Sequence, residues 1–131
     1  MFSMSIIKKI FKIFKKNDIV YHILDEIRIC IPEKYLSIYG EQINYIDKII
    51  WVLDKEVDLY FSKDYPLSLN IEQFDETKIS NVNITDIFGK KYIIQVYFVN
   101  GHIFSLESNL PFKGLMINEI QEMKFHCFLQ D

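Results

Sequence analysis

The segment YIIQVYFVNGHIFSLE, residues 92–107, constrains the fold of this chain more than any other part. Its Asn100-Gly101 pair is the strongest short turn signal, because a type I′ turn needs positive φ at both central residues. In the register that a two-residue turn sets, Tyr97 would lie opposite Phe104, and both faces of the hairpin would be largely apolar. A one-sided antiparallel sheet alternates between apolar and polar residues. We therefore expect each face of this hairpin to be covered.

Three segments with helical spacing come before the strand-rich part of the chain. Residues 5–16 place Ile and Phe side chains on one side and five lysines mostly on the other. Residues 18–31 carry a second apolar stripe, which Pro32 ends. A third helix is predicted to begin near Pro32, with an apolar line that runs to Ile46.

Strand patterns follow at 48–53 and 57–61, then at 79–87 and in the hairpin. The polar region 62–78 is predicted to be mainly a loop with a short extended piece at 67–71, and 117–125 is predicted to be a short helix. Helices followed by about five strands on short connections predict an α+β fold. We expect one domain over 1–131, with the N-terminal helices packed on an antiparallel meander.

The charge of the chain is unevenly distributed. Its net charge is −3, from 15 basic and 18 acidic residues, but residues 1–16 hold five lysines and no acid. The remainder therefore carries 10 − 18 = −8. An acidic body disfavours nucleic acid as a partner, because phosphate binding needs a basic surface. It favours a basic protein partner, because complementary charge speeds encounter and selects against wrong partners.

Two readings of the basic segment 1–16 are open. Its apolar stripe could cover the exposed face of the sheet while its lysines reach water, or it could contact anionic lipid. We favour the first, because the sheet needs a cover and one short basic helix is a weak anchor. No run approaches the roughly 20 apolar residues of a membrane span, and no secretory signal is recognisable. We therefore expect a cytoplasmic protein in which Cys30 and Cys127 are buried thiols, although the two could in principle pair.

The sequence contains no recognisable catalytic or cofactor motif. The three histidines, His22, His102 and His126, have no metal-ligand spacing, and no nucleophile elbow, phosphate-binding loop or dinucleotide fingerprint is present. In the expected register His102 faces away from Ser105 and Glu107, which argues against an acid–base pair. We expect no enzymatic activity, no metal and no cofactor. A ligand-binding or enzymatic sheet face lined by Tyr97, His102 and Phe104 is the alternative.

An acidic segment is the strongest candidate for a binding site. From Asp54 to Glu76 the chain holds seven acids and two lysines, so its net charge is 2 − 7 = −5. The acids fall in a turn, on the outward side of a strand and in a long loop, where binding residues concentrate. Two tyrosines add amphipathic contact area. A solvated loop without a partner is the alternative, and the spacing is not that of an EF-hand. The predicted partner-binding residues are Asp54, Glu56, Asp58, Tyr60, Asp64, Tyr65, Glu72, Asp75 and Glu76.

The hairpin VYFVNGHIFSLESN, preceded by KIIWVLDKEVDLYF and the acidic loop, resembles small bacterial immunity proteins of polymorphic or contact-dependent growth-inhibition toxin systems. The resemblance covers about Tyr35 to Asn109. It implies a cytosolic, non-catalytic protein that binds the C-terminal domain of a toxin, often a basic nuclease, and blocks its active site. It transfers no binding residue position by position. A homodimer paired through the sheet is a further alternative.

Overall fold

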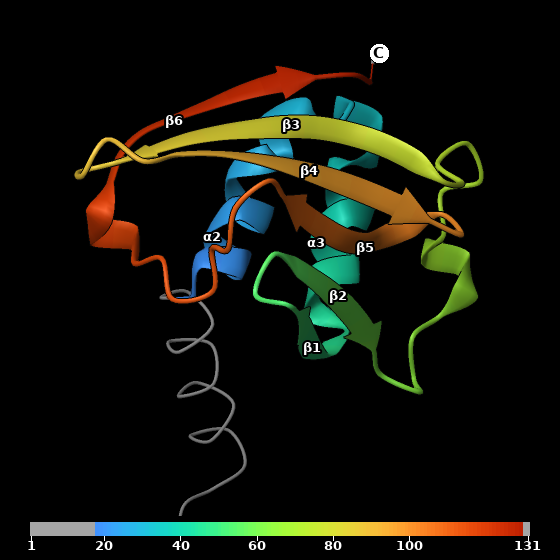
Figure 1. The fold of residues 1–131 in the computed structure, drawn as a ribbon. Coiled ribbons are helices and arrows are strands. Elements are labelled where there is room, and N and C mark those ends of the chain that lie inside the picture. Colours follow the sequence, from blue (N-terminus) through green and yellow to red (C-terminus); the bar gives the residue numbers. More distant parts are fainter. Residues whose placement is uncertain (1–17, 130–131) are drawn as a thin grey trace, which may run out of the picture.

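The computed structural model describes residues 18–129 (Figure 1). Helix α2 (Ile19–Glu26) continues into a 3₁₀ turn, Ile27–Cys30, and a second 3₁₀ turn, Glu33–Tyr35, leads into α3 (Leu36–Asn44). The second and third predicted helices are thus confirmed, while the helix expected at 5–16 lies outside the described residues. Asp18 caps α2, because its Oδ1 accepts a hydrogen bond from the Val20 N–H at 2.7 Å.

Within residues 18–129, six antiparallel strands form one sheet. They are β1 (Ile46–Val52), β2 (Glu56–Phe61), β3 (Thr77–Asp86), β4 (Lys91–Val99), β5 (His102–Ser108) and β6 (Ile120–Cys127), and their spatial order is β1-β2-β5-β4-β3-β6. The predicted α+β class is confirmed, with six strands where about five were expected. The order also differs from a simple meander, because β2 pairs with β5 and the C-terminal strand pairs with β3.

Two short segments differ from their predicted structure. The helix expected at 117–125 is only a 3₁₀ turn, Ile117–Glu119, and the rest of that segment is strand β6. Met123 and Phe125 alternate with exposed Lys124 and His126, and they pack against the core with the period of two that a strand allows. The extended piece expected at 67–71 is instead a 3₁₀ turn, Leu67–Leu69.

The β4–β5 hairpin contains a bulge that the turn signal does not reveal. Val99 pairs with His102 as expected, but the register then shifts, so that Tyr97 lies opposite Ser105 and Val96 opposite Leu106. A one-residue shift moves every later side chain of a strand to the other face. The expectation of two largely apolar faces is therefore wrong: one face of the hairpin is buried and apolar, and the other is mixed, with Ile93, Tyr97 and Val99 beside polar residues that include Gln95 and Glu107.

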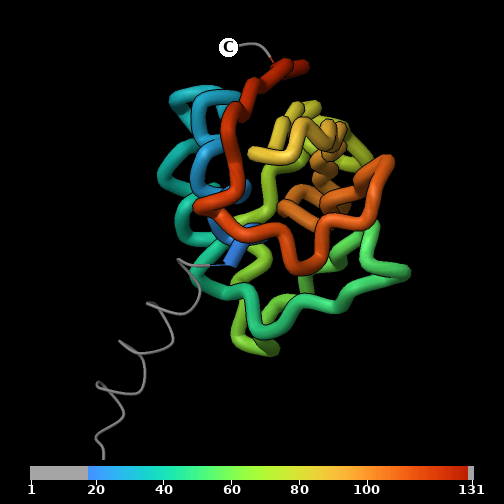
Figure 2. The backbone as a smooth tube through the Cα atoms, turned by 60° about the vertical axis from the view of Figure 1, so that its left-hand side comes forward, coloured from blue at the N-terminus to red at the C-terminus, as the bar shows by residue number. Residues whose placement is uncertain are grey.

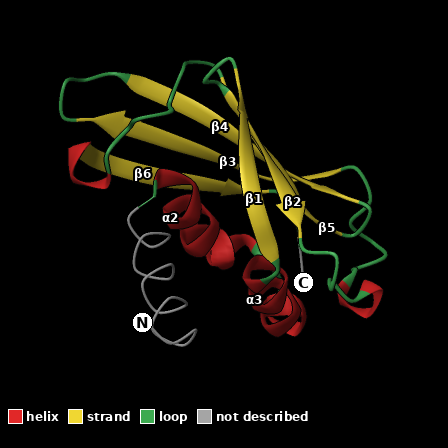
Figure 3. Cartoon of the chain, turned by 90° about the horizontal axis from the view of Figure 1, so that it is seen from below, coloured by secondary structure: helices red, strands yellow, loops and turns green. Residues whose placement is uncertain are grey.

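The core lies between the helices and the apolar face of the sheet. Helices α2 and α3 both cover this face, as Figures 2 and 3 show. Tyr39 of α3 is fully buried and its hydroxyl donates to the Leu24 carbonyl at 2.5 Å, which joins the two helices. No described helix covers the opposite face, which we call the open face (Figure 3). Within residues 18–129, no helix has the length and apolar character that a bilayer crossing requires.

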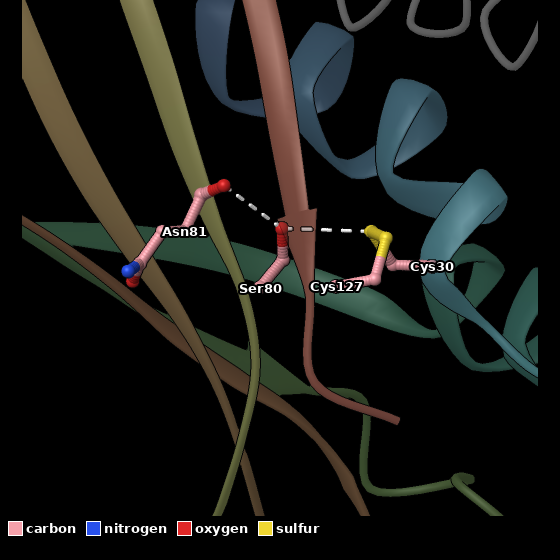
Figure 4. Close-up of a disulfide and its surroundings, with 4 residues drawn as sticks. All are labelled: Cys30, Ser80, Asn81 and Cys127. Atoms are coloured by element: carbon pink, nitrogen blue, oxygen red, sulfur yellow. Dashed lines mark hydrogen bonds between the residues drawn. A yellow bond between two sulfur atoms is a disulfide. The ribbon is translucent and has the colours of Figure 1, made fainter. Parts of the chain in front are cut away.

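A disulfide joins Cys30, at the end of the first 3₁₀ turn, to Cys127, at the end of β6 (Figure 4). Their Cα atoms are 5.0 Å apart and the residues are separated by 97 positions in the chain. The expectation of free thiols is therefore wrong. The pairing depends on β6, because only a strand added beside β3 brings the C-terminal segment over the end of the helical layer.

Candidate functional site

Acidic side chains from two strands meet on the open face. Val57 and Leu59 of β2 are buried in the core, so the alternation of the strand turns Glu56 and Asp58 to the open face. Strand β5 places Glu107 directly opposite Glu56. We call Glu56, Asp58 and Glu107 the face carboxylates.

The arrangement of the face carboxylates lowers the stability of the fold. Like charges directly opposite each other on neighbouring strands are destabilising, and Glu56 and Glu107 stand in that relation. None of the three carboxylates forms an ion pair among residues 18–129, where the ion pairs join Asp25 to Arg28 and Glu122 to Lys124. Concentrated, uncompensated negative charge is a feature that an external cationic group would stabilise.

Asp58 is the most perturbed of the three carboxyl groups. Partial desolvation raises its pKa from 3.8 to about 6, and a hydrogen bond with Glu56 and repulsion from the Glu56 charge act in the same direction. Its Oδ1 is buried and has no hydrogen-bond partner among the described residues, and the same holds for Asn81 Oδ1. Asn81 pairs with Gln95 and Gln95 with Glu107, so both unsatisfied acceptors belong to the open face.

Exposed apolar side chains flank the carboxylates at the edge of the sheet. Ile50 lies opposite Asp58, and Val52 lies opposite Glu56. These two β1 side chains are 40% and 42% exposed, and Tyr60 of β2 is 41% exposed. An acidic patch beside apolar and aromatic side chains can provide both charge and desolvated contact area to a protein partner.

The structure separates the residues that the sequence grouped as one site. Glu56, Asp58 and Tyr60 share the open face, while Asp54 is in the β1–β2 turn. Four other acids belong to the segment between β2 and β3, which packs against the turn of the β4–β5 hairpin: Asp64, Glu72, Asp75 and Glu76. There Asp75 Oδ1 accepts from the Asn100 N–H at 3.1 Å, and Glu72 and Asp75 line a shallow depression. These four residues, the loop acids, form a second group.

Tyr65 is half-buried among other aromatic rings. Its ring packs against the rings of Tyr45, Phe61 and His102, at centroid distances of 5.8, 4.9 and 5.6 Å. Its hydroxyl donates to Asn70 Oδ1 at 2.7 Å, and burial raises its pKa to about 12. Tyr65 therefore holds the segment between β2 and β3 against the sheet.

Glu107 is the site residue that sequence reasoning missed. The expected register placed Glu107 opposite Ile94, whereas the bulge places it opposite Gln95 and in line with Glu56. Only the position of the bulge could have revealed that Glu107 lies beside Glu56. His102 has a structural environment, because its ring lies 4.5 Å from the Phe61 ring and its Nδ1 lies 2.9 Å from the Ile103 carbonyl oxygen.

Among the described residues, no three His, Cys, Asp or Glu side chains form a group that could hold a metal ion. Comparison with known protein families, with characterised proteins and with solved structures found no match to this chain.

Proposed function

We propose that this protein is a non-catalytic inhibitor that binds a basic toxin domain through the open face of its sheet, as an immunity protein does. The observation that supports this is the opposed pair Glu56 and Glu107 beside Asp58, three carboxylates that form no ion pair among the described residues. Lysine or arginine side chains of a nuclease active site would pair with these carboxylates. The nuclease would then meet protein carboxylates at the place where it binds phosphate.

The apolar edge provides the second part of this interface. Charge complementarity contributes specificity and association rate more than affinity, and desolvated anchors contribute much of the affinity. Ile50 and Val52 flank the carboxylates as such anchors, and Tyr60 lies beside them with the Lys48 ammonium 5.6 Å from its ring centroid. The proposed interface is therefore centred on β2 and its two neighbours.

Binding through Asp58 should release protons. The raised pKa of Asp58, about 6, means that this carboxyl group is partly protonated in mildly acidic solution. A cationic partner favours the charged form. The affinity for the toxin domain should therefore increase between about pH 5 and pH 7, and Asp58→Asn should weaken binding and reduce this pH dependence.

The proposal places the protein in the cytoplasm, where a nuclease toxin would find its substrate. Disulfides seldom persist in that compartment, so the binding face should work with Cys30 and Cys127 reduced. The order of the strands is compatible with this, because β5, which carries Glu107, is separated by β4 and β3 from β6, which carries Cys127. Binding should be equal with and without a reductant.

Co-purification of the full chain with the product of the neighbouring gene tests the proposal. Glu56→Gln/Asp58→Asn/Glu107→Gln removes the charge of the face carboxylates with little change in shape, and should abolish the complex. The matched control, Asp64→Asn/Glu72→Gln/Asp75→Asn/Glu76→Gln, neutralises the loop acids and should retain it. A complex unaffected by the first variant, or no complex of the unaltered chain, would refute the proposed function.

A further inference from the structure

The two halves of the sheet carry opposite net charge. Strands β1, β2 and β5 hold one lysine and four acids, 1 − 4 = −3, whereas β4, β3 and β6 hold three lysines and two acids, 3 − 2 = +1. The first set is Asp47, Lys48, Glu56, Asp58 and Glu107, and the second is Lys78, Asp86, Lys91, Glu122 and Lys124. The order of the strands keeps the two sets apart, because β5 and β4 are neighbours at the middle of the sheet.

Both acids of the positive half have partners, whereas two of its lysines form no ion pair. The buried Asp86 carboxylate accepts hydrogen bonds from two backbone N–H groups of the β3–β4 turn, both at 2.9 Å. Glu122 pairs with Lys124 at 2.8 Å. Lys78 and Lys91 take part in no ion pair within residues 18–129. Carboxylates from outside the chain would therefore complement this half of the sheet.

The strand register arranges the open face in rows that run across the sheet. One row consists of Ile50, Asp58, Ser105, Tyr97 and Lys78, each directly opposite the next. The neighbouring row consists of Glu56, Glu107, Gln95 and Asn81. In both rows the carboxylates lie on β2 and β5, and side chains with hydrogen-bond donors lie on β4 and β3. Gln95 Oε1 accepts from the Tyr97 hydroxyl at 2.6 Å, so the NH₂ group is the remaining polar group of Gln95.

A two-fold axis parallel to the strands would bring unlike groups of two open faces together. If the axis passes between β5 and β4, each row lies over the same row of the second copy in reverse order, with β2 over β3 and β5 over β4. Asp58 then faces Lys78 of the second copy, and the contact occurs twice. In the neighbouring row the two glutamates face the two amides. An axis at right angles to the strands would instead place carboxylates against carboxylates, so charge selects the first arrangement.

Two further features of the open face suit a contact with a second sheet. Asp58 Oδ1 is buried without a hydrogen-bond partner among the described residues, and a facing ammonium group would supply the donor. Phe128 directly follows β6, and its ring centroid lies 4.9 Å from the Lys78 ammonium, which places Phe128 on this face. Ile50 and Phe128 are 40% and 41% exposed, and the axis would bring them together because it places β1 over β6. Sheets that pack face to face in this alignment interdigitate such side chains in one layer.

We propose that two copies of this chain form a symmetric dimer through their open faces, with Asp58 of each copy opposite Lys78 of the other. The dimer covers the face carboxylates, so a toxin domain binds only the monomer, and the two complexes exclude each other. In this regulatory role the inference rests on the proposed function, whereas the dimer itself does not.

Sedimentation velocity of the full chain over a range of protein concentrations tests the inference without the toxin. The unaltered chain should dimerise. Asp58→Lys and Lys78→Asp should each raise the dissociation constant of the dimer about a hundredfold, because each places like charges opposite each other in two symmetric contacts. The matched controls, Asp64→Lys and Lys113→Asp, make the same charge changes at exposed positions outside the sheet and should dimerise as the unaltered chain does.

An equimolar mixture of the Asp58→Lys and Lys78→Asp chains separates a direct contact from a folding defect. In the mixed dimer each lysine again faces an aspartate, so the mixture should dimerise although neither chain does so alone. A mixture that stays monomeric, a monomeric unaltered chain, or single variants that dimerise normally would each overturn the inference. If Asp58→Lys does not fold, Lys78→Asp and its Lys113→Asp control decide the question.

The dimer and the toxin complex are measured separately, so that the failure of either can be recognised. Lys78→Asp leaves the face carboxylates intact and should retain the complex with the toxin domain in the co-purification. A dimer without a toxin complex would refute the proposed function alone, and a toxin complex without a dimer would refute the dimer alone.

Discussion

The side-chain amide of Gln42 donates a hydrogen bond to the carbonyl oxygen of Gly101 at 3.0 Å, which joins α3 to the turn of the β4–β5 hairpin. The same amide donates to the Leu69 carbonyl at 2.6 Å, and Gln42 Oε1 accepts from the Ile103 N–H at 3.2 Å. One fully buried glutamine thus connects a helix, a hairpin and the segment that carries the loop acids.

Gln42→Leu should lower the free energy of unfolding by about 2–4 kcal/mol, because it leaves buried backbone groups without partners. Urea denaturation measures the change. Gln73→Leu, at an exposed position, should change it by less than about 0.5 kcal/mol. Similar losses in the two variants would show that the hydrogen bonds of Gln42 do not account for the effect.

Gly101→Ala should be more destabilising than Gly89→Ala, although both glycines have positive φ, at +84° and +81°. A Cβ at Gly101 would lie 2.8 Å from the Ile71 backbone nitrogen, whereas a Cβ at Gly89 would meet nothing within 4 Å. We expect a loss of about 1 kcal/mol at Gly89, from backbone conformation alone, and about 3 kcal/mol at Gly101. Thermal unfolding of the two variants compares them. Equal losses would mean that the hairpin turn moves freely away from residues 70–71.

Asp58→Asn should stabilise the protein at pH 7 and have little effect at pH 4. The folded state raises the pKa of the Asp58 carboxyl group from 3.8 to about 6. Below the lower value this group is protonated in the folded and the unfolded protein alike. Above the higher value it is charged in both, and the charge destabilises only the folded protein. Stability should therefore fall as pH rises through this interval. After allowance for solvent screening the gain from Asn is about 1 kcal/mol. Urea titrations at the two pH values measure it, and a larger gain at pH 4 would contradict the assignment.

Reduction of the Cys30–Cys127 disulfide should lower the free energy of unfolding by about 4 kcal/mol, because the bond closes a loop with a sequence separation of 97. Denaturation with and without dithiothreitol measures the loss. The Cys30→Ser/Cys127→Ser variant should have the stability of the reduced protein and no response to dithiothreitol. A response to dithiothreitol in that variant would show that the reductant acts elsewhere.

The sequence by itself determined the elements whose signals are local. Pro32 ends one helical stripe and begins the next, and Asn100-Gly101 sets a turn with φ angles of 55° and 84°. Periodicity then separated the helical half of the chain from the strand-rich half, because side-chain patterns of 3.6 and 2 residues are readable in a single segment.

The tertiary structure alone decided what depends on pairing between distant segments. The bulge in β5 moved Glu107 into line with Glu56, and the addition of β6 beside β3 brought Cys127 to Cys30. Neither event leaves a local signal, since register and strand order follow from which side chains can be buried together. For the same physical reason the acidic residues that are continuous in sequence became two groups, one on the open face and one in the loop.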